Sequence, residues 1–324
     1  MLPETTPTVT AATETLYPAQ PDPGPPPQPR PAKLQITRFA KAGGPLTKRI
    51  SLSDDGALVS DGSACIMVRG CAQRVHFDTL NALADLIASL KPHEAIALGA
   101  LRNDLPDRVE VVTRDHLAKL NGTAAPNVIA RTASNIIYPP GQPAVALIDV
   151  DTKGMTDRIK SRIRDMGGFW PALVSVLPAL QTCGRVIRPS TSACITRTDT
   201  GEALHGSNGL HVYVPLRDGM DIERFLRTLH ERCWLAGFGW HMLGAGGQLL
   251  DRSLVDRTVY APERLVFEAA PILHSPLIQD RACRKPTVHG GPAPRYRRGM
   301  SAAPYRRGGG SQKAEGSVYP CAGA

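Results

Sequence analysis

Long apolar segments are missing from this sequence of 324 residues. No apolar run approaches the roughly 18–20 residues that a membrane-spanning helix needs, and the N-terminus lacks the basic-then-apolar order of a secretory signal. The first absence argues against a transmembrane helix and the second against export. Hydrophobic residues still make up 42% of the chain, enough for a sizeable core. We therefore expect a globular, cytoplasmic protein.

Paired cysteine motifs are also missing. The seven cysteines are scattered and include no CxxC pair, which favours a reducing compartment over a disulfide framework. Cys183, Cys194, His205 and Cys233 could in principle converge on zinc, but their spacings match no ligand signature. The pattern indicates ordinary small, buried side chains.

Proline and basic residues are concentrated at the two ends. Residues 1–32 hold ten of the 29 prolines, which predicts an extended, disordered leader. Residues 271–324 hold nine Lys/Arg against two Asp/Glu, a balance of 9 − 2 = +7 within a total of +9. This tail repeats PRYRRGM and PYRRGGG, a composition that cannot bury a core but can contact phosphates and stack on bases. A solvated terminus without a partner is the alternative, and the folded region is predicted to be 33–270.

Apolar periodicity in this central region alternates between helix and strand spacing. Helices are predicted over 78–90, with Asp78 as N-cap, over 155–166 and over 221–235. Strands are predicted for the segments 94–99, 144–151, 186–188, 193–197 and 210–216. Because helices and strands mix without a strict βαβ repeat, the pattern predicts an α+β fold rather than a doubly wound sheet.

The apolar run AVALIDVD at 144–151 contains two aspartates, Asp149 and Asp151. On a strand, residues i and i+2 point to the same face, roughly 7 Å apart at Cα. Two such carboxylates can share hard divalent cations, and two cations roughly 3.5–4 Å apart can activate an attacking oxygen and stabilise a leaving phosphate oxygen. The alternative is a solvated aspartate pair that caps the following turn.

A glycine-rich turn precedes the strand LHVYVPL. Gly209, together with the preceding glycine at 206, lets backbone N–H groups approach an anion, Ser207 offers a hydroxyl, and His211 can donate to a phosphate. These residues form a candidate triphosphate cradle. The alternative for His211 is a core histidine with satisfied hydrogen bonds.

The segment LVDRTVYAPERLVFE, residues 254–268, supplies a third carboxylate and an arginine. Asp256 ends a short apolar stretch, and Arg264 follows after a turn that contains Pro262. A two-metal site that contains Asp149 and Asp151 needs such a third carboxylate. Asp251 competes with Asp256 for this role, and a surface Asp–Arg pair is the alternative reading.

The order of these motifs resembles the archaeo-eukaryotic primase (AEP) superfamily, the primase-polymerases. The features are a strand ending in DxD, a small-x-His turn at Gly209 to His211, and an apolar-Asp followed by VY and a downstream arginine. GLHVYVPL is also similar to the corresponding strand in the polymerase domain of bacterial end-joining DNA ligases. The similarity covers residues 90–270.

The resemblance implies a template-dependent nucleotidyltransferase, a DNA primase or polymerase with catalytic domain 33–270. In that family an N-terminal α/β unit packs with an RRM-like sheet, and the counterparts of Asp149, Asp151 and Asp256 hold two divalent cations, Mg²⁺ or Mn²⁺. A 3′-hydroxyl attacks the α-phosphate and pyrophosphate leaves. The implied partners are nucleoside triphosphates, a single-stranded or primed DNA template, and a helicase or other replication protein.

The same resemblance assigns nucleotide contacts. The counterpart of His211 contacts the incoming triphosphate, and an arginine near Arg264 helps to bind the phosphates. The ligase-type turn has a lysine where this chain has an asparagine at 208, so Arg188, Ser190 or Ser192 are expected to supply phosphate contacts instead. Two other classes stay open: a metal-dependent phosphodiesterase or nuclease, and a catalytically inactive nucleic-acid-binding module.

Overall fold

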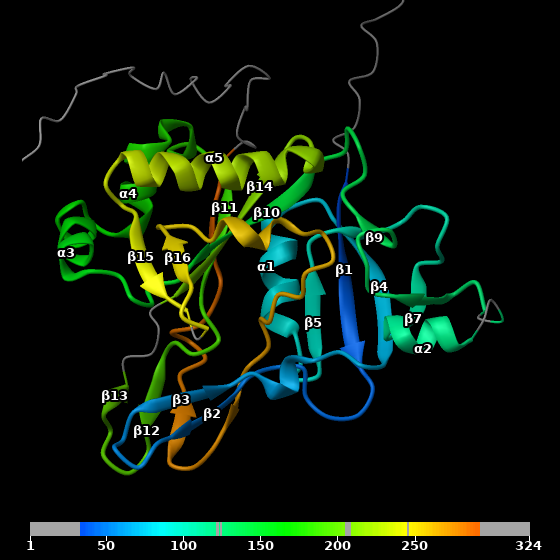
Figure 1. Ribbon diagram of the computed structural model, residues 1–324, viewed down its shortest axis with the longest axis horizontal. Helices are drawn as coiled ribbons and strands as arrows, with labels where there is room; N and C mark the ends of the chain where they lie inside the picture. Colours follow the sequence, from blue (N-terminus) through cyan, green and yellow to red (C-terminus); the bar gives the residue numbers. More distant parts are fainter. Residues whose placement is uncertain (1–32, 121–122, 124, 205–208, 245, 292–324) are drawn as a thin grey trace, which may run out of the picture. The chain divides into compact units, whose positions relative to one another are not determined.

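Two main sheets organise the chain in the computed structural model, which describes residues 33–120, 123, 125–204, 209–244 and 246–291 (Figure 1). The first sheet has five strands, antiparallel except for its last pair. In spatial order they are β5 (Glu94–Ala97), β1 (Leu34–Lys41), β4 (Gly70–Phe77), β7 (Arg108–Val112) and β8 (Val128–Ala130).

The second sheet is antiparallel and has four strands. Their spatial order is β10 (Ala144–Val150), β14 (Leu210–Leu216), β11 (Arg185–Pro189) and β19 (Thr287–His289). β10 and β14 are buried along most of their length, which explains why their sequences are continuous apolar runs rather than alternating patterns. The polar exceptions, Asp149 and His211, lie directly opposite each other near one end.

Helices cover the second sheet. The largest apolar cluster contains residues of both sheets and of α1, α3, α4 and α5. The helix α1 begins after Thr79, whose hydroxyl accepts a hydrogen bond from the Ala82 N–H. The helical segments are α1 (Leu80–Ser89), α2 (Arg114–Lys119), α3 (Asp157–Asp165), α4 (Phe169–Val176), α5 (Ile222–Leu235) and the 3₁₀ turns η1 (Ser63–Cys65), η2 (Pro178–Leu180), η3 (Gly219–Asp221) and η4 (Arg257–Tyr260).

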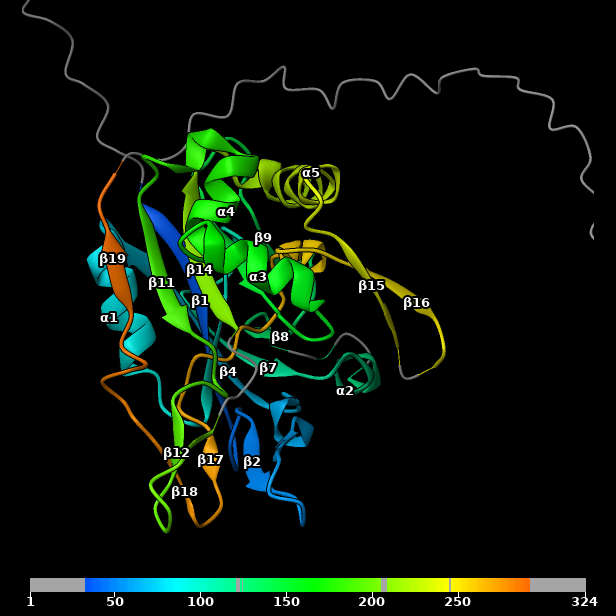
Figure 2. The same ribbon diagram turned by 90° about the vertical axis from the view of Figure 1, so that its left-hand side faces the viewer.

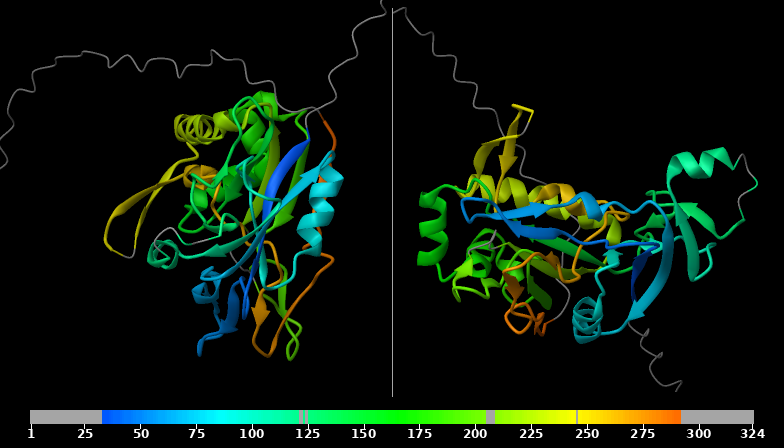
Figure 3. Two further views of the ribbon diagram at one scale, coloured as in Figure 1. Left: turned by 90° about the vertical axis from the view of Figure 1, so that its right-hand side faces the viewer. Right: turned by 90° about the horizontal axis from the view of Figure 1, so that it is seen from below.

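The remaining strands form small sheets and hairpins. The hairpin β15–β16 projects from the body of the fold in Figures 2 and 3. These strands are β2 (Arg49–Leu52), β3 (Leu58–Asp61), β6 (Ala100–Leu101), β9 (Ile136–Ile137), β12 (Ile195–Arg197), β13 (Ala203–Leu204), β15 (Trp240–Leu243), β16 (Leu249–Arg252), β17 (Ile272–Leu273) and β18 (Leu277–Gln279).

The predicted α+β class is confirmed at this level: several sheets combine with a few helices. The helices predicted from periodicity are present with trimmed ends, and Thr79 rather than Asp78 is the N-cap of α1. The predicted leader, 1–32, lies outside the described residues. Within the described ranges, no helix is long and apolar enough to cross a membrane.

The predicted end of the folded region at Ala270 differs from the structure. β17 pairs with β2, β18 with β12, and β19 with β11, so regular structure continues to His289. These strands are only two or three residues long, and β19 is exposed along its length, so no periodicity marks them in the sequence. Of the predicted basic tail, only residues 292–324 lie outside the described part.

Candidate active site

A row of polar side chains crosses the second sheet at the end of β10. Asp149 on β10 is opposite His211 on β14, and His211 is opposite Arg188 on β11. Residues paired in register across a sheet point to the same face. The fold thus places the aspartate, the histidine and an arginine side by side, although they lie in three separate segments of the sequence.

Asp256 joins this row through the backbone. Its N–H donates to the Asp149 carbonyl oxygen at 3.0 Å, which fixes the start of η4 against the end of β10. Burial raises the pKa of the Asp149 carboxyl above its usual value, and the nearby carboxylates of Asp256 and Asp151 raise it further, against the lowering effects of His211 and Arg264. The structure therefore brings together the three predicted carboxylates and Arg264.

The other two carboxylates accept local hydrogen bonds. Asp151 follows the last residue of β10 and accepts from the Lys153 N–H at 2.9 Å. Asp256 accepts from the Thr258 N–H at 2.8 Å and caps η4. The competing Asp251 lies on β16, where it faces His241 of β15 at 3.1 Å. The backbone link to Asp149 makes Asp256 the better third carboxylate.

The donor set fits hard divalent cations. Carboxylate oxygens are the ligands that Mg²⁺ and Mn²⁺ prefer, and the mutual repulsion that raises the pKa of Asp149 is relieved by a bound cation. Among the described residues, no three His, Cys, Asp or Glu side chains already converge as a metal-binding group. Asp149, Asp151 and Asp256 are the residues that would hold such a cation.

A cavity of about 430 Å³ opens beside these carboxylates. Its wall includes the acidic Asp151 and Asp256 together with the basic Arg252, Arg257 and Arg264. Arg264 is exposed, and its Nη1 donates to the Thr258 carbonyl at 3.3 Å. Acidic groups that can hold cations and guanidinium groups that can bind phosphates thus share one wall.

His211 is held from behind by a buried glutamate. Its Nδ1 lies 2.5 Å from Oε1 of Glu268, whose side chain is 0% exposed, and its Nε2 lies 3.7 Å from Oδ1 of Asp149. Burial lowers the pKa of His211, but the Glu268 carboxylate and, beyond it, Asp149 outweigh this effect and raise it. The imidazole therefore has one nitrogen fixed by Glu268 and the other on the side of Asp149.

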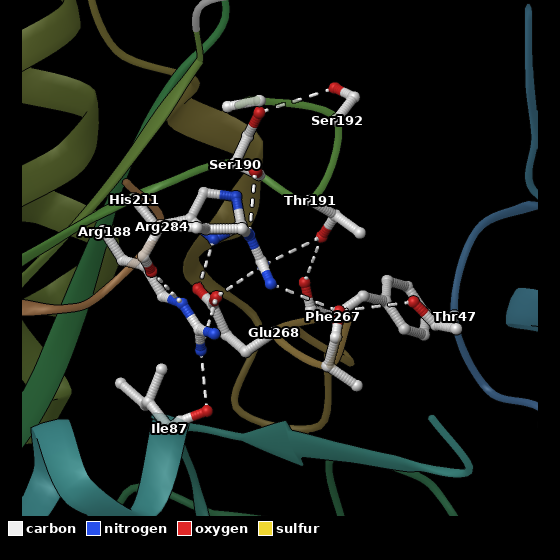
Figure 4. A network of polar contacts seen from close by, with 12 residues as sticks. Thr47, Ile87, Arg188, Ser190, Thr191, Ser192, His211, Phe267, Glu268 and Arg284 are labelled. Carbon is white, nitrogen blue, oxygen red and sulfur yellow. Dashed lines mark hydrogen bonds and ion pairs between the residues drawn. The ribbon is translucent and has the colours of Figure 1, made fainter. Parts of the chain in front are cut away.

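Glu268 lies at the centre of a polar network (Figure 4). Tyr213 Oη donates to Oε1, while Arg188 Nη1 and Arg284 Nη2 lie 3.4 and 3.3 Å from Oε2. Although burial raises the pKa of this carboxyl, His211 and the two arginines lower it more, so that it lies below its usual value. The imidazole and the two guanidinium groups thus favour the charged form of this buried carboxyl.

Arg188 is a structural residue, contrary to the expectation that it supplies a phosphate contact. Its Nη1 donates to the Ile87 carbonyl at 2.6 Å, its Nε donates to the Arg284 carbonyl at 3.3 Å, and its side chain is 8% exposed. All of these contacts point into the core. Burial of the guanidinium is possible because Glu268 balances its charge.

The turn around Gly209 is tightly packed. The Ser190 N–H donates to the Gly209 carbonyl at 2.9 Å, and a Cβ on Gly209 would lie 2.9 Å from the Val150 carbonyl oxygen. Gly209 is thus needed for the close approach of β10, whatever its role toward an anion. Ser190 and Ser192 lie in the loop after β11, with their hydroxyls 3.5 Å apart, whereas Ser207 is outside the described residues.

The expectation of unpaired cysteines is wrong for Cys194 and Cys283. They form a disulfide between residues 89 positions apart, a pairing that spacing alone does not reveal. Of the other zinc candidates, His205 lies outside the described residues, and burial raises the pKa of the Cys183 and Cys233 thiols to about 11 and about 12. The disulfide removes Cys194 from the candidate zinc set, and Cys183 and Cys233 are buried core side chains.

Glu268 and Arg284 escaped the sequence-based prediction. Glu268 stands within RLVFEAAPIL, and an isolated acid flanked by apolar residues on both sides is a signal of a buried, paired carboxylate. Arg284 carries no comparable signal, because the surrounding sequence RACRKP contains no apolar run that would indicate burial. Comparison of the chain with family models, with curated proteins and with solved structures gives no significant match.

Proposed function

We propose that the chain is a template-dependent nucleotidyltransferase, a DNA primase or polymerase of the primase-polymerase type. One observation supports this most strongly: the carboxylates of Asp149, Asp151 and Asp256 gather at one end of a four-stranded sheet, beside His211 and the arginine-bearing cavity. An N-terminal α/β unit packed on an RRM-like sheet is the corresponding fold proposal.

The combination of acidic residues for cations and basic residues for phosphates suits phosphoryl transfer. When bound, Mg²⁺ or Mn²⁺ ions would neutralise charge on the phosphates and promote attack by a 3′-hydroxyl, with release of pyrophosphate. The protein's own residues would position the reactants: Asp149, Asp151 and Asp256 hold the cations, while His211 and Arg264 bind phosphate oxygens. Ser190, Ser192 and Gly209 flank the same end of the sheet and are the further proposed nucleotide contacts.

The substrates in this proposal are nucleoside triphosphates and a single-stranded or primed DNA template, in the cytoplasm. Catalysis by positioning and charge neutralisation needs no covalent intermediate on the protein. The arginines of the cavity wall support this reading, because a purely structural aspartate cluster does not require cationic neighbours on an open surface.

The test is nucleotide incorporation by the full chain on primed and unprimed single-stranded DNA with Mg²⁺ or Mn²⁺. We expect Asp149→Asn/Asp151→Asn to lower incorporation by at least about a hundredfold, as for residues that act on the transferred phosphate. The matched control is Asp157→Asn/Asp165→Asn, which removes two exposed carboxylates from α3 and should change little.

Other outcomes of the same assay identify the alternatives. Shortening of the DNA without added nucleotides, lost in the Asp149/Asp151 variant, would replace the proposal by a nuclease. DNA binding without incorporation or shortening under either metal would replace it by an inactive binding module.

A further inference from the structure

Glu268 has more partners than a stabilising ion pair requires. Its carboxylate is 0% exposed, and the partners divide by oxygen: His211 and Tyr213 contact Oε1, whereas Arg188 and Arg284 contact Oε2. A buried carboxylate is costly, and an apolar core of similar volume is often at least as stable. The arrangement therefore calls for an explanation other than stability.

The two arginines fix the position of the carboxylate. Arg284 is itself anchored by hydrogen bonds from its Nε to the Ser190 carbonyl at 3.0 Å and from its Nη2 to Thr191 Oγ1 at 3.4 Å. Arg188 is anchored to the Ile87 carbonyl. Oε1 is thus presented to the imidazole by a scaffold drawn from four different segments (Figure 4).

The carboxylate in turn fixes the imidazole. A hydrogen bond at Nδ1 sets which ring nitrogen carries the proton and how the ring is turned. With Nδ1 committed to Glu268, only Nε2 is directed to the side of Asp149, from which it is 3.7 Å away.

We propose that Glu268, held by Arg188 and Arg284, is a positioning residue that orients His211 so that its Nε2 edge faces the phosphates of a bound nucleotide. This inference rests on the proposed function, because it takes a nucleoside triphosphate as the ligand of His211. It also makes Arg284, from outside the predicted catalytic domain, part of the site's support.

A double-mutant cycle tests the proposal. The variants are Glu268→Gln, His211→Ala and their combination in the full chain, and the measurement is the Kd of dATP with Mg²⁺ for folded protein. Partners that orient a metal-ligating histidine are typically worth about 10–100-fold, and by analogy we expect Glu268→Gln to weaken dATP binding by about tenfold. In the His211→Ala background the same substitution should change the Kd by less than about twofold, because the two residues act through one another.

Two controls separate positioning from general disruption. Tyr213→Phe removes a second donor to Oε1 but leaves the carboxylate, and it should change dATP binding by less than about threefold. Glu94→Gln removes another largely buried, ion-paired carboxylate, in the five-stranded sheet, and should leave dATP binding unchanged. If Glu268→Gln weakens binding equally with and without His211, the proposal is refuted.

A spectroscopic measurement covers the case in which no nucleotide binds at all. In protein labelled with ¹⁵N-histidine, the His211 signals are identified among nine histidines by their loss in His211→Ala. We expect a protonated, hydrogen-bonded Nδ1 in the wild type and a changed Nδ1 signal in Glu268→Gln. If dATP does not bind but the Nδ1 signal differs between the wild type and Glu268→Gln, only the nucleotidyltransferase proposal is refuted. If the His211 signals of these two proteins are identical, the positioning role is refuted.

If Glu268→Gln fails to fold, Arg284→Lys replaces it. This variant keeps the positive charge but loses the fork that reaches Ser190, Thr191 and Glu268 together. A smaller weakening of dATP binding, again absent in the His211→Ala background, supports the proposal. Weakening that persists in that background overturns it.

Discussion

The two main sheets differ in how they accommodate charge. In the five-stranded sheet each buried charge has a more exposed partner: the side chains of Arg38 and Glu94 are 31% and 8% exposed, and those of Arg74 and Asp107 are 8% and 82% exposed. In the four-stranded sheet, Arg188, Arg284 and Glu268 are buried together. Because such burial is costly, the contrast teaches that stability alone does not explain the polar row of the second sheet.

The largest effect is expected when the C-terminal segment is removed. A chain ending at the predicted boundary, Ala270, lacks Arg284, β18, β19 and one half of the disulfide. We expect it to lose its cooperative thermal transition, because Glu268 is left underpaired and β11 loses its edge strand. Circular dichroism during heating measures this.

Hydrogen exchange sharpens the same experiment. In the shortened chain, amides of β10, β14 and β11 should lose protection to a greater extent than those of β1 and β4. The matched control ends at Gly291, which keeps every described strand and contact. Uniform loss of protection across both sheets would show that the two sheets depend equally on the C-terminal segment.

A single buried arginine provides the second test. Arg284→Met leaves Glu268 with one guanidinium fewer, and we expect a loss of about 3–5 kcal/mol in the free energy of unfolding. The matched variant in the other sheet, Arg38→Met, removes a partner of Glu94 that is 31% exposed, so that water screens the ion pair, and should cost about 1 kcal/mol. Urea denaturation gives both values, and equal losses would abolish the contrast between the sheets.

The same contrast explains what the sequence could predict. β10 and β14 are continuous apolar runs and α5 is strongly periodic, and these predicted elements carry Asp149, His211 and the stripe Ile222 to Cys233. The proximity of Asp256 to Asp149 could be predicted only from the order of the motifs. Glu268 acquires its partners from β14, β11 and the C-terminal segment, and such long-range pairing leaves no local pattern.

The boundary at Ala270 was missed for a similar reason. Gly, Arg and Pro are frequent after it, yet specific contacts hold residues 277–284 in place. β18 pairs with β12, and the disulfide and Arg284 connect to the loop after β11. A few specific contacts outweigh a composition that is typical of disorder.

The disulfide provides the third test. Cys194→Ser opens a covalent loop that joins residues 89 positions apart, and we expect a loss of about 2–4 kcal/mol in the free energy of unfolding. Cys65→Ser, at a free cysteine outside the four-stranded sheet, should stay within about 0.5 kcal/mol. A dithiol reductant should remove the difference between Cys194→Ser and the wild type; a difference that survives reduction would mean that packing, not the bond, is responsible.

The smallest expected effect concerns a buried histidine of α5. Burial lowers the pKa of His230, whose Nδ1 lies 2.9 Å from Ser253 Oγ. At pH values between this lowered pKa and the usual value of about 6.5, the unfolded chain holds more protons than the folded one. The contribution of neutral His230 to the free energy of unfolding is therefore complete above about pH 6.5, and it is lost as the pH falls through the lowered pKa.

His230→Gln should therefore make the decline in stability between about pH 7.5 and pH 5 shallower, by less than about 1 kcal/mol. The measurement is the free energy of unfolding in urea at several pH values. His116→Gln, at an exposed position on α2 beside the five-stranded sheet, is the matched control and should follow the wild-type curve. If both variants follow the wild-type curve, His230 binds its proton equally well in the folded and unfolded states, and the contrast between the sheets is confined to the Glu268 network.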